Sequence, residues 1–345
     1  MAVTVAIAPA AAPMVERTVL PLALLLATLV LLLCLLSLAA GRASLSPAEV
    51  LAGLFGYGDE AARLIVREVR LPRTLLGLLV GGTLGLTGAA LQGLLRNPLA
   101  EPALLGVSGS ASLGAVIAFY FGFAASFPLA LPLGGMAGAL LAVTLLYALA
   151  GREASALTLI LAGVAINSMA AALTALALNL APSPYAAVEI LFWLLGSLAD
   201  RSFDQVRLAL PLVLLGWLLL AGIGRSLDAL TLGEDTARSL GINLAALQRR
   251  IILGTALSVG ATTSVTGSVG FIGLVVPHLL RPLVGYRPGV LLWLSALGGA
   301  ALTLAADILI RWIASGQELR LGVITALLGA PFFLWLVLRT RRALS

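Results

Sequence analysis

One short motif has the residue types for nucleophilic catalysis. The run Gly106-Val107-Ser108-Gly109 matches the GxSG pattern that surrounds the nucleophile of serine proteases acting inside membranes, and His278 is a conceivable base. Matches of this length are common in a chain with 37 glycines. Small residues such as Gly106 and Gly109 more often let two helices approach closely. We therefore interpret this run as a packing surface and His278 as a structural hydrogen-bonding residue.

The basic and metal-binding residues exclude several classes of chemistry. All 21 basic residues are arginines, and a P-loop requires the lysine of GxxxxGK[ST], so the chain cannot hydrolyse ATP by that route. Energy must come from a partner subunit or an ion gradient. Cys34 is the single cysteine and His278 the single histidine. We expect no cofactor and no metal, haem or zinc site built from these side chains alone.

A few polar residues interrupt long apolar stretches. Asp307 and Arg311 are four residues apart, the spacing of an ion pair within one helix. Gln92 and Asn167 are uncharged, and either hydrogen bonds between helices or lining of a transport pathway would explain them. No acidic residue lies at the centre of an apolar stretch, which argues against a proton-coupled or sodium-coupled carrier.

The elements that position these residues are apolar segments of membrane-spanning length. Hydrophobic residues make up 61% of the chain and charged residues 10%, with a mean hydropathy of +1.10. A span needs roughly 20 apolar residues. Ten candidates result: 19–40, 74–95, 104–123, 128–150, 156–180, 208–224, 250–266, 268–285, 289–310 and 321–338. The first is too long for the apolar core of a signal peptide, so we expect it to be retained as a span.

The span count depends on the stretch from Ile251 to Leu280, which carries no formal charge and is either one long helix or two short ones. Arg17 precedes the first span, and three arginines follow the last, at 339, 341 and 342. The positive-inside rule then places both termini in the cytoplasm. An even number of spans is required, which favours two helices here and ten spans in total.

Two hydrophilic segments have helix-capping patterns. In the outer segment 41–70, Ser46 and Glu49 have the spacing of a capping box. The inner segment 225–250 has acids ahead of apolar residues at helical spacing, and Gly241 stands where a C-cap belongs. We predict two short surface helices on the cytoplasmic face there.

Two weaker patterns concern broken helices and repetition. The apolar run Ala187–Leu198 is too short to cross, so it either dips toward a pathway or lies in the interface. Gly88 and Pro98 have the same spacing as Gly267 and Pro277. With five spans in each half, this echo is compatible with inverted repeats.

Several motifs together resemble one family, the permease subunits of ATP-binding cassette (ABC) importers for iron-siderophores, haem and cobalamin. The resemblance runs in order along nearly the whole chain from Leu45 to Leu338. The residues that carry it are RLPR (70–73), GAALQGLLRNPLAEPALLGVSGSASLGA (88–115), LILAGVAIN (159–167), LTLGEDTARSLGI (230–242), SVGFIGLVVPHLLRPLVG (268–285) and LRLGVITALLGAPFF (319–333).

The resemblance implies roles for particular residues. Binding-protein docking corresponds to Arg70, Arg73 and Arg311, and a cytoplasmic gate to Asn97 and Leu99. The coupling segment that fits the ATPase corresponds to Gly233, Glu234, Ala237, Arg238 and Gly241. A second gate strand corresponds to Glu153–Thr158, but its hydroxyl pattern fits only in part, so no gate residue is assigned there.

Together, the composition, the spans and the resemblance predict the fold, the partners and the function of the chain. We expect an all-α polytopic membrane protein, a single transmembrane permease domain over residues 1–345 with its coupling segment at about 225–250. The resemblance implies a bacterial inner-membrane homodimer, without enzymatic activity of its own, that works with two ATP-binding subunits and a periplasmic substrate-binding protein. The cargo is an iron chelate, siderophore or haem, with cobalamin as the alternative. An ion-coupled carrier and a GxSG-type protease are the competing interpretations.

Overall fold

The computed structural model describes residues 12–123, 127, 129–151, 155–181, 183–313 and 319–344, and these residues form helices and connections without a strand. The longer helices are α1 (Ala12–Ala39), α4 (Leu71–Leu94), α5 (Val107–Tyr120), α7 (Ala130–Ala150), α8 (Ala156–Asn179), α10 (Phe203–Leu220), α13 (Leu244–Thr266), α15 (Pro288–Ile313) and α16 (Leu321–Leu344). The shorter ones are α2 (Pro47–Phe55), α3 (Glu60–Leu64), η1 (Ile65–Arg70), η2 (Pro102–Leu105), α9 (Pro184–Leu194), α11 (Gly224–Leu230), α12 (Glu234–Ser239), α14 (Ile272–Leu280) and η3 (Arg281–Val284).

Each predicted span overlaps one or two helices of this set, so the all-α fold class is confirmed. Among the described residues, six helices are long and apolar enough to cross a membrane, and α5, α9, α14 with η3, and α16 provide shorter apolar stretches. The crossing of the membrane by ten segments remains a prediction.

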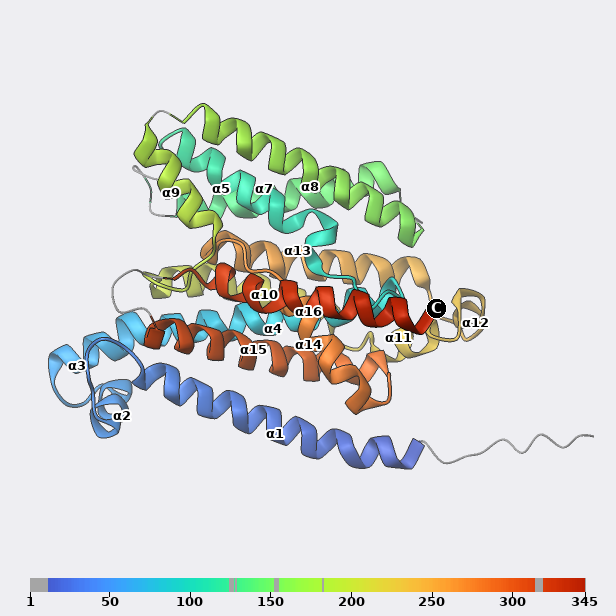
Figure 1. Cartoon of the computed structure of the whole chain (residues 1–345), viewed down its shortest axis with the longest axis horizontal. Coiled ribbons are helices and arrows are strands. Elements are labelled where there is room, and N and C mark those ends of the chain that lie inside the picture. The colour runs from blue at the N-terminus through green and yellow to red at the C-terminus, as the bar shows by residue number, and fades with distance from the viewer. Residues whose placement is uncertain are drawn as a thin grey trace, which may run out of the picture.

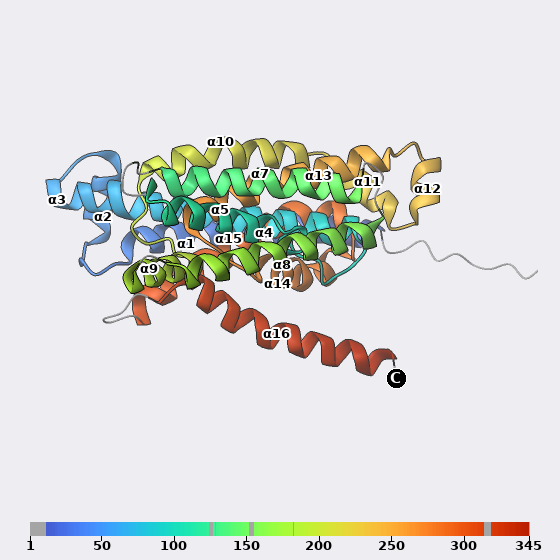
Figure 2. The ribbon, with the colours of Figure 1, turned by 90° about the horizontal axis from the view of Figure 1, so that it is seen from above.

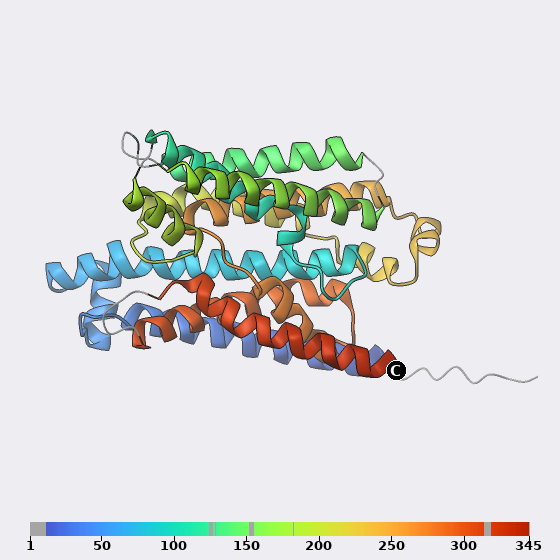
Figure 3. The ribbon, with the colours of Figure 1, turned by 45° about the horizontal axis from the view of Figure 1, so that its top comes forward.

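The long helices lie side by side along the longest axis of the molecule (Figure 1). α2 and α3 lie at one end of this bundle and α11 and α12 at the other. The start of α1 and the end of α16 both lie at the end that carries α11 and α12 (Figures 1 and 3). Seen from above, α16 runs obliquely, and its C-terminal part stands away from the other helices (Figure 2).

α4 is the central helix, and glycines let its neighbours approach its backbone. A Cβ atom at Gly81 would collide with the carbonyl of Gly299 on α15, and one at Gly85 with the carbonyl of Ser295. Small residues at such crossings allow the close backbone contact that holds helices together in lipid, where apolar burial gives little driving force. The core of the bundle therefore forms where α4 and α15 cross.

The uncharged stretch from Ile251 to Leu280 forms two helices, as predicted. α13 ends at Thr266, and Gly267 and Phe271, with φ of 75° and 66°, turn the chain into α14. A Cβ at Gly88 of α4 would meet the backbone of Gly273, so α14 packs tightly against α4. The proposed inverted repeat remains a prediction.

The predicted caps are present. Ser46 and Glu49 form a reciprocal capping box at the start of α2, and the hydrogen bonds from Ser46 lower the pKa of the Glu49 carboxyl. Segment 225–250 contains the two predicted short helices, α11 and α12. After α12, Gly241 adopts φ 83°, with N–H bonds from Gly241 to Arg238 and from Ile242 to Ala237, a Schellman motif.

Candidate functional site

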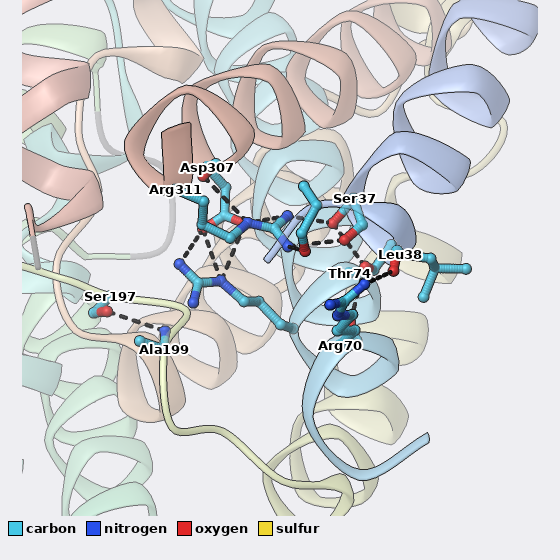
Figure 4. Close-up of polar contacts among 10 residues, drawn as sticks. Ser37, Leu38, Arg70, Thr74, Ser197, Ala199, Asp307 and Arg311 are labelled. Carbon is cyan, nitrogen blue, oxygen red and sulfur yellow. Dashed lines mark hydrogen bonds and ion pairs between the residues drawn. The ribbon is translucent and has the colours of Figure 1, made fainter. Parts of the chain in front are cut away.

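Arg73 of α4 forms a charge cluster with Asp307 and Arg311 of α15; Figure 4 shows Asp307 and Arg311 beside the end of α1. The Arg73 guanidinium donates to both Asp307 oxygens, at 2.9 to 3.1 Å. Arg311 Nη2 lies 2.9 Å from the other side of the same carboxylate, which confirms the predicted pair within α15. Asp307 is only 1% exposed. One buried carboxylate therefore holds two guanidinium groups.

Arg70 and Arg311 cap the C-terminal end of α1. Arg70 Nη1 donates to the carbonyls of Leu38 and Ala39, both at 2.8 Å, and Arg311 Nη1 donates to Ser37 and Ala40, at 2.8 and 3.0 Å. The last carbonyls of a helix have no partner within it and carry its negative dipole end. The two arginines satisfy these carbonyls and fix α1 against α4 and α15.

These hydrogen bonds and ion pairs limit how far the three arginines predicted to dock the binding protein are exposed. Arg70 is 4% exposed, and the side chains of Arg311 and Arg73 are 9% and 15% exposed. Arg73 is the most accessible of the three within a single chain. The docking role remains a prediction.

The loop predicted to form the cytoplasmic gate lies at the other end, beside α12. Asn97 Oδ1 accepts a hydrogen bond from Leu99 N at 2.9 Å, which fixes the turn after α4. Arg96, in a left-handed conformation with φ 48°, precedes Asn97. Its guanidinium lies 3.6 Å from the carboxylate of Glu234 on α12. The two predicted sites, gate and coupling segment, are thus brought together.

The residues predicted to contact the ATPase form a short, mostly exposed helix with one buried side chain, that of Ala237. Ala237 is fully buried, whereas the carboxylate of Glu234 and the guanidinium of Arg238 are about half exposed and 3.9 Å apart. Gly233, with φ 104°, begins the helix and Gly241 ends it. Leu232 and Leu240 are exposed on either side. This combination of an anchored helix with exposed leucines is suited to contact with another subunit.

Gln92 forms interhelical hydrogen bonds. Pro277 has no N–H, so the carbonyl of Gly273 loses its partner within α14. Gln92 Nε2 donates to that carbonyl at 3.3 Å and to that of Leu274 at 3.4 Å, and Gln92 Oε1 accepts from Arg281. The side chain is 2% exposed. The structure thus shows the interhelical hydrogen bonds of Gln92, and its role in lining a pathway remains a prediction.

Asn167 has the opposite environment. It is exposed on α8 and borders an open cavity of about 330 Å³ together with Ser112, Thr174 and Ser268. A Cβ at Gly109 would collide with the Asn167 side chain, so the GxSG run serves close helix packing. His278 stacks edge to face on Phe332 of α16, 5.7 Å between ring centres.

Sequence reasoning missed two residues at the α11–α12 end. Arg96 directly precedes the gate motif, and Arg281 follows α14, but their partners Glu234 and Gln92 lie 138 and 189 residues away. The only signal in the sequence was that both arginines lie within family motifs, at 88–115 and 268–285.

Comparisons with known proteins identify the family. The model of the FecCD transport family matches residues 29–339. The chain belongs to the FecCD transport family. Its relatives include the vitamin B12 import permease BtuC of Vibrio cholerae, 40% identical, with 91% of this chain and 93% of that protein covered. The uncharacterised ABC transporter permease YvrB of Bacillus subtilis is 41% identical, with 84% and 83% covered.

The fold agrees with this membership. A solved structure described as an inward-facing putative metal-chelate type ABC transporter matches with a TM-score of 0.82 and 31% identity, covering 92% of this chain and 98% of that one. As a FecCD permease, the chain is the membrane-embedded, non-catalytic transport subunit of an ABC importer.

Proposed function

We propose that this chain forms one half of a homodimeric channel in the bacterial inner membrane and passes an iron chelate, siderophore or haem, into the cell. Two separate ATP-binding subunits would supply the energy and a periplasmic binding protein would deliver the cargo. Residues 1–345 would act as one permease domain, with both termini and the coupling segment in the cytoplasm. The common end of α1, α16 and α12 supports this orientation (Figure 1).

The polar surface of α8 is the observation that supports the proposed homodimer. Asn167 and Ser168 are exposed, on a helix whose Leu157 and Leu161 are exposed as well. A polar amide facing hydrocarbon is costly, and polar residues inside membrane proteins usually face a cavity or another helix. A second copy packed along α8 and the divergent α16 would shield this surface and enclose a pathway between the subunits (Figure 2).

Coupling would run through Arg96 and Glu234. Closure of the ATP-binding subunits would move α12, and the ion pair would transmit the movement to Asn97 and Leu99 at the gate. Exposed ion pairs contribute under about 1 kcal/mol to stability, so loss of this pair should leave the fold intact.

The reversal of both charges tests this linkage. Glu234→Arg should reduce transport while expression and thermal stability stay unchanged, and Arg96→Glu combined with Glu234→Arg should restore part of it. A control reversal, Glu60→Arg in α3, should have no effect, because Glu60 pairs only weakly with Arg63 at the opposite end. Equal loss in the single and double variants would show that the pair does not transmit movement.

A corrinoid is the second candidate cargo. Relatives that are 39 to 40% identical are named vitamin B12 import permeases. Uptake of ⁵⁵Fe-siderophore, ⁵⁵Fe-haem and ⁵⁷Co-cyanocobalamin by the reconstituted importer, each challenged with the other two unlabelled, would distinguish them. Uptake of ⁵⁷Co alone would replace the iron chelate with cobalamin, and uptake of none would reject both.

A further inference from the structure

A basic cavity opens at the α11–α12 end of the bundle. It has a volume of about 210 Å³ and lies between the last turns of α4, the turn after α11, η3 and the start of α15. Its polar groups come from Gln92, Arg96, Thr231, Arg281 and Tyr286, and Ala89 and Leu291 belong to its apolar wall. We propose that this cavity binds the phosphate of an anionic phospholipid.

The charges in the cavity favour an anion. Arg281 uses one donor on Gln92 Oε1, and in the part of the chain that the structure describes no carboxylate lies within 4.0 Å of its guanidinium. Arg96 has one carboxylate, Glu234, at 3.6 Å. Of the two guanidinium groups, only that of Arg96 has a carboxylate partner, and this carboxylate also pairs with Arg238 at 3.9 Å. Arginine's planar fork binds phosphate oxygens in pairs, so a phosphate would complete the site.

The surroundings favour a lipid over free phosphate. The cavity has a basic opening and an apolar wall, which matches an amphiphile with a phosphate at one end. Leu283 and Tyr286 follow Arg281 in the chain and are both exposed, an arrangement typical of a membrane surface. Basic pockets between transmembrane helices on the cytoplasmic side are known sites for anionic headgroups.

The test uses the purified, delipidated full-length chain in detergent. Phosphatidylglycerol and phosphatidylcholine with the same acyl chains are titrated, and binding is read by native mass spectrometry and by the shift in melting temperature. Inorganic phosphate is titrated in a separate arm. We expect selective binding of phosphatidylglycerol, weakened roughly tenfold or more in Arg281→Gln, because a charge-assisted hydrogen bond is lost.

Two further variants separate the cavity from general effects. Thr231→Phe should fill the cavity from its exposed side while it keeps both guanidinium groups, and it should also abolish selectivity. Arg225→Gln removes an exposed arginine that lines a different cavity and should bind lipid as the unmodified chain does. The melting temperature without lipid shows whether Arg281→Gln has simply loosened α14.

Three results would overturn the assignment. Equal binding of phosphatidylglycerol by all variants would place the lipid elsewhere on the surface. Binding of inorganic phosphate without any preference for phosphatidylglycerol would make the ligand a free ion. Absence of lipid binding together with loss of ATPase co-purification in Arg281→Gln would make the cavity part of a protein contact.

Discussion

Arg73 on α4 donates hydrogen bonds to both carboxylate oxygens of Asp307 on α15, 234 residues away in the chain, at 2.9 to 3.1 Å. The same carboxylate pairs with Arg311, whose guanidinium in turn caps α1. Three helices therefore depend on one buried acid. This arrangement gives the region stability and limits which arginines can meet a partner.

Replacement of Asp307 by asparagine should destabilise the protein severely. The substitution leaves two largely buried guanidinium groups without their carboxylate, and breaking one partner of a buried pair typically costs about 3 to 5 kcal/mol. Thermal unfolding in detergent measures the effect. Asp204→Asn is the control, because the Asp204 and Arg207 pair is exposed at 3.5 Å and should cost under about 1 kcal/mol. Equal effects of the two substitutions would contradict the buried cluster.

Gln92→Leu should destabilise the protein by about 1 to 3 kcal/mol, because it leaves the Gly273 carbonyl buried without a donor. Pro277→Ala should reduce that loss, since an alanine N–H can bond the carbonyl within α14. A double-mutant cycle on thermal stability in detergent tests the relationship. Additive effects would mean that Gln92 does not compensate for the proline.

Gly241→Pro should leave membrane insertion intact and reduce both transport and co-purification with the ATPase. Proline cannot adopt the φ of 83° found at Gly241 and has no N–H for the Arg238 carbonyl, so the end of α12 must rearrange. Gly122→Pro is a matched control, with φ 75°, an N–H bond to Phe119 and equally open surroundings. Normal transport by the Gly241 variant would reduce the coupling segment to a linker.

Arg73→Ala should weaken docking of the binding protein several-fold, and more at low salt, because screening reduces exposed charge interactions. Asp307 keeps Arg311 in this variant, so the fold should tolerate the change. Reversal of Arg70, Arg73 and Arg311 together is unsuitable as a test, because Arg70 and Arg311 hold α1 in place. Affinity measured against ionic strength decides the matter, and an unchanged affinity and salt slope would place docking elsewhere.

The sequence was sufficient to predict the long helices and two of the local contacts. Apolar segments predicted the helices, the Ser46–Glu49 spacing predicted a capping box, and the Asp307–Arg311 spacing predicted an ion pair. The capping box and the ion pair depend only on neighbours within about four residues. The bonds from Arg70 and Arg311 to α1 could not be predicted, since they depend on how distant helices pack.

Gln92 and Asn167 show the same limit. Both are uncharged polar residues within apolar helices, and the sequence offered one pair of explanations for both. Their surroundings differ in the structure: Gln92 is buried and bonds two carbonyls of α14 and Arg281 of η3, whereas Asn167 lies on the exposed side of α8. The difference depends on which helix packs against each residue, and the sequence of one helix does not contain that information.

ATP-dependent uptake tests the central claim most directly. The purified chain is reconstituted in liposomes alone and with its ATP-binding subunit and binding protein, and ATP hydrolysis and uptake of labelled metal chelate are measured in each preparation. We predict neither activity for the chain alone, which has no lysine for a P-loop, and both for the complete assembly. Hydrolysis by the isolated chain, or uptake that continues without ATP, would contradict its assignment as the permease subunit of an ATP-driven importer.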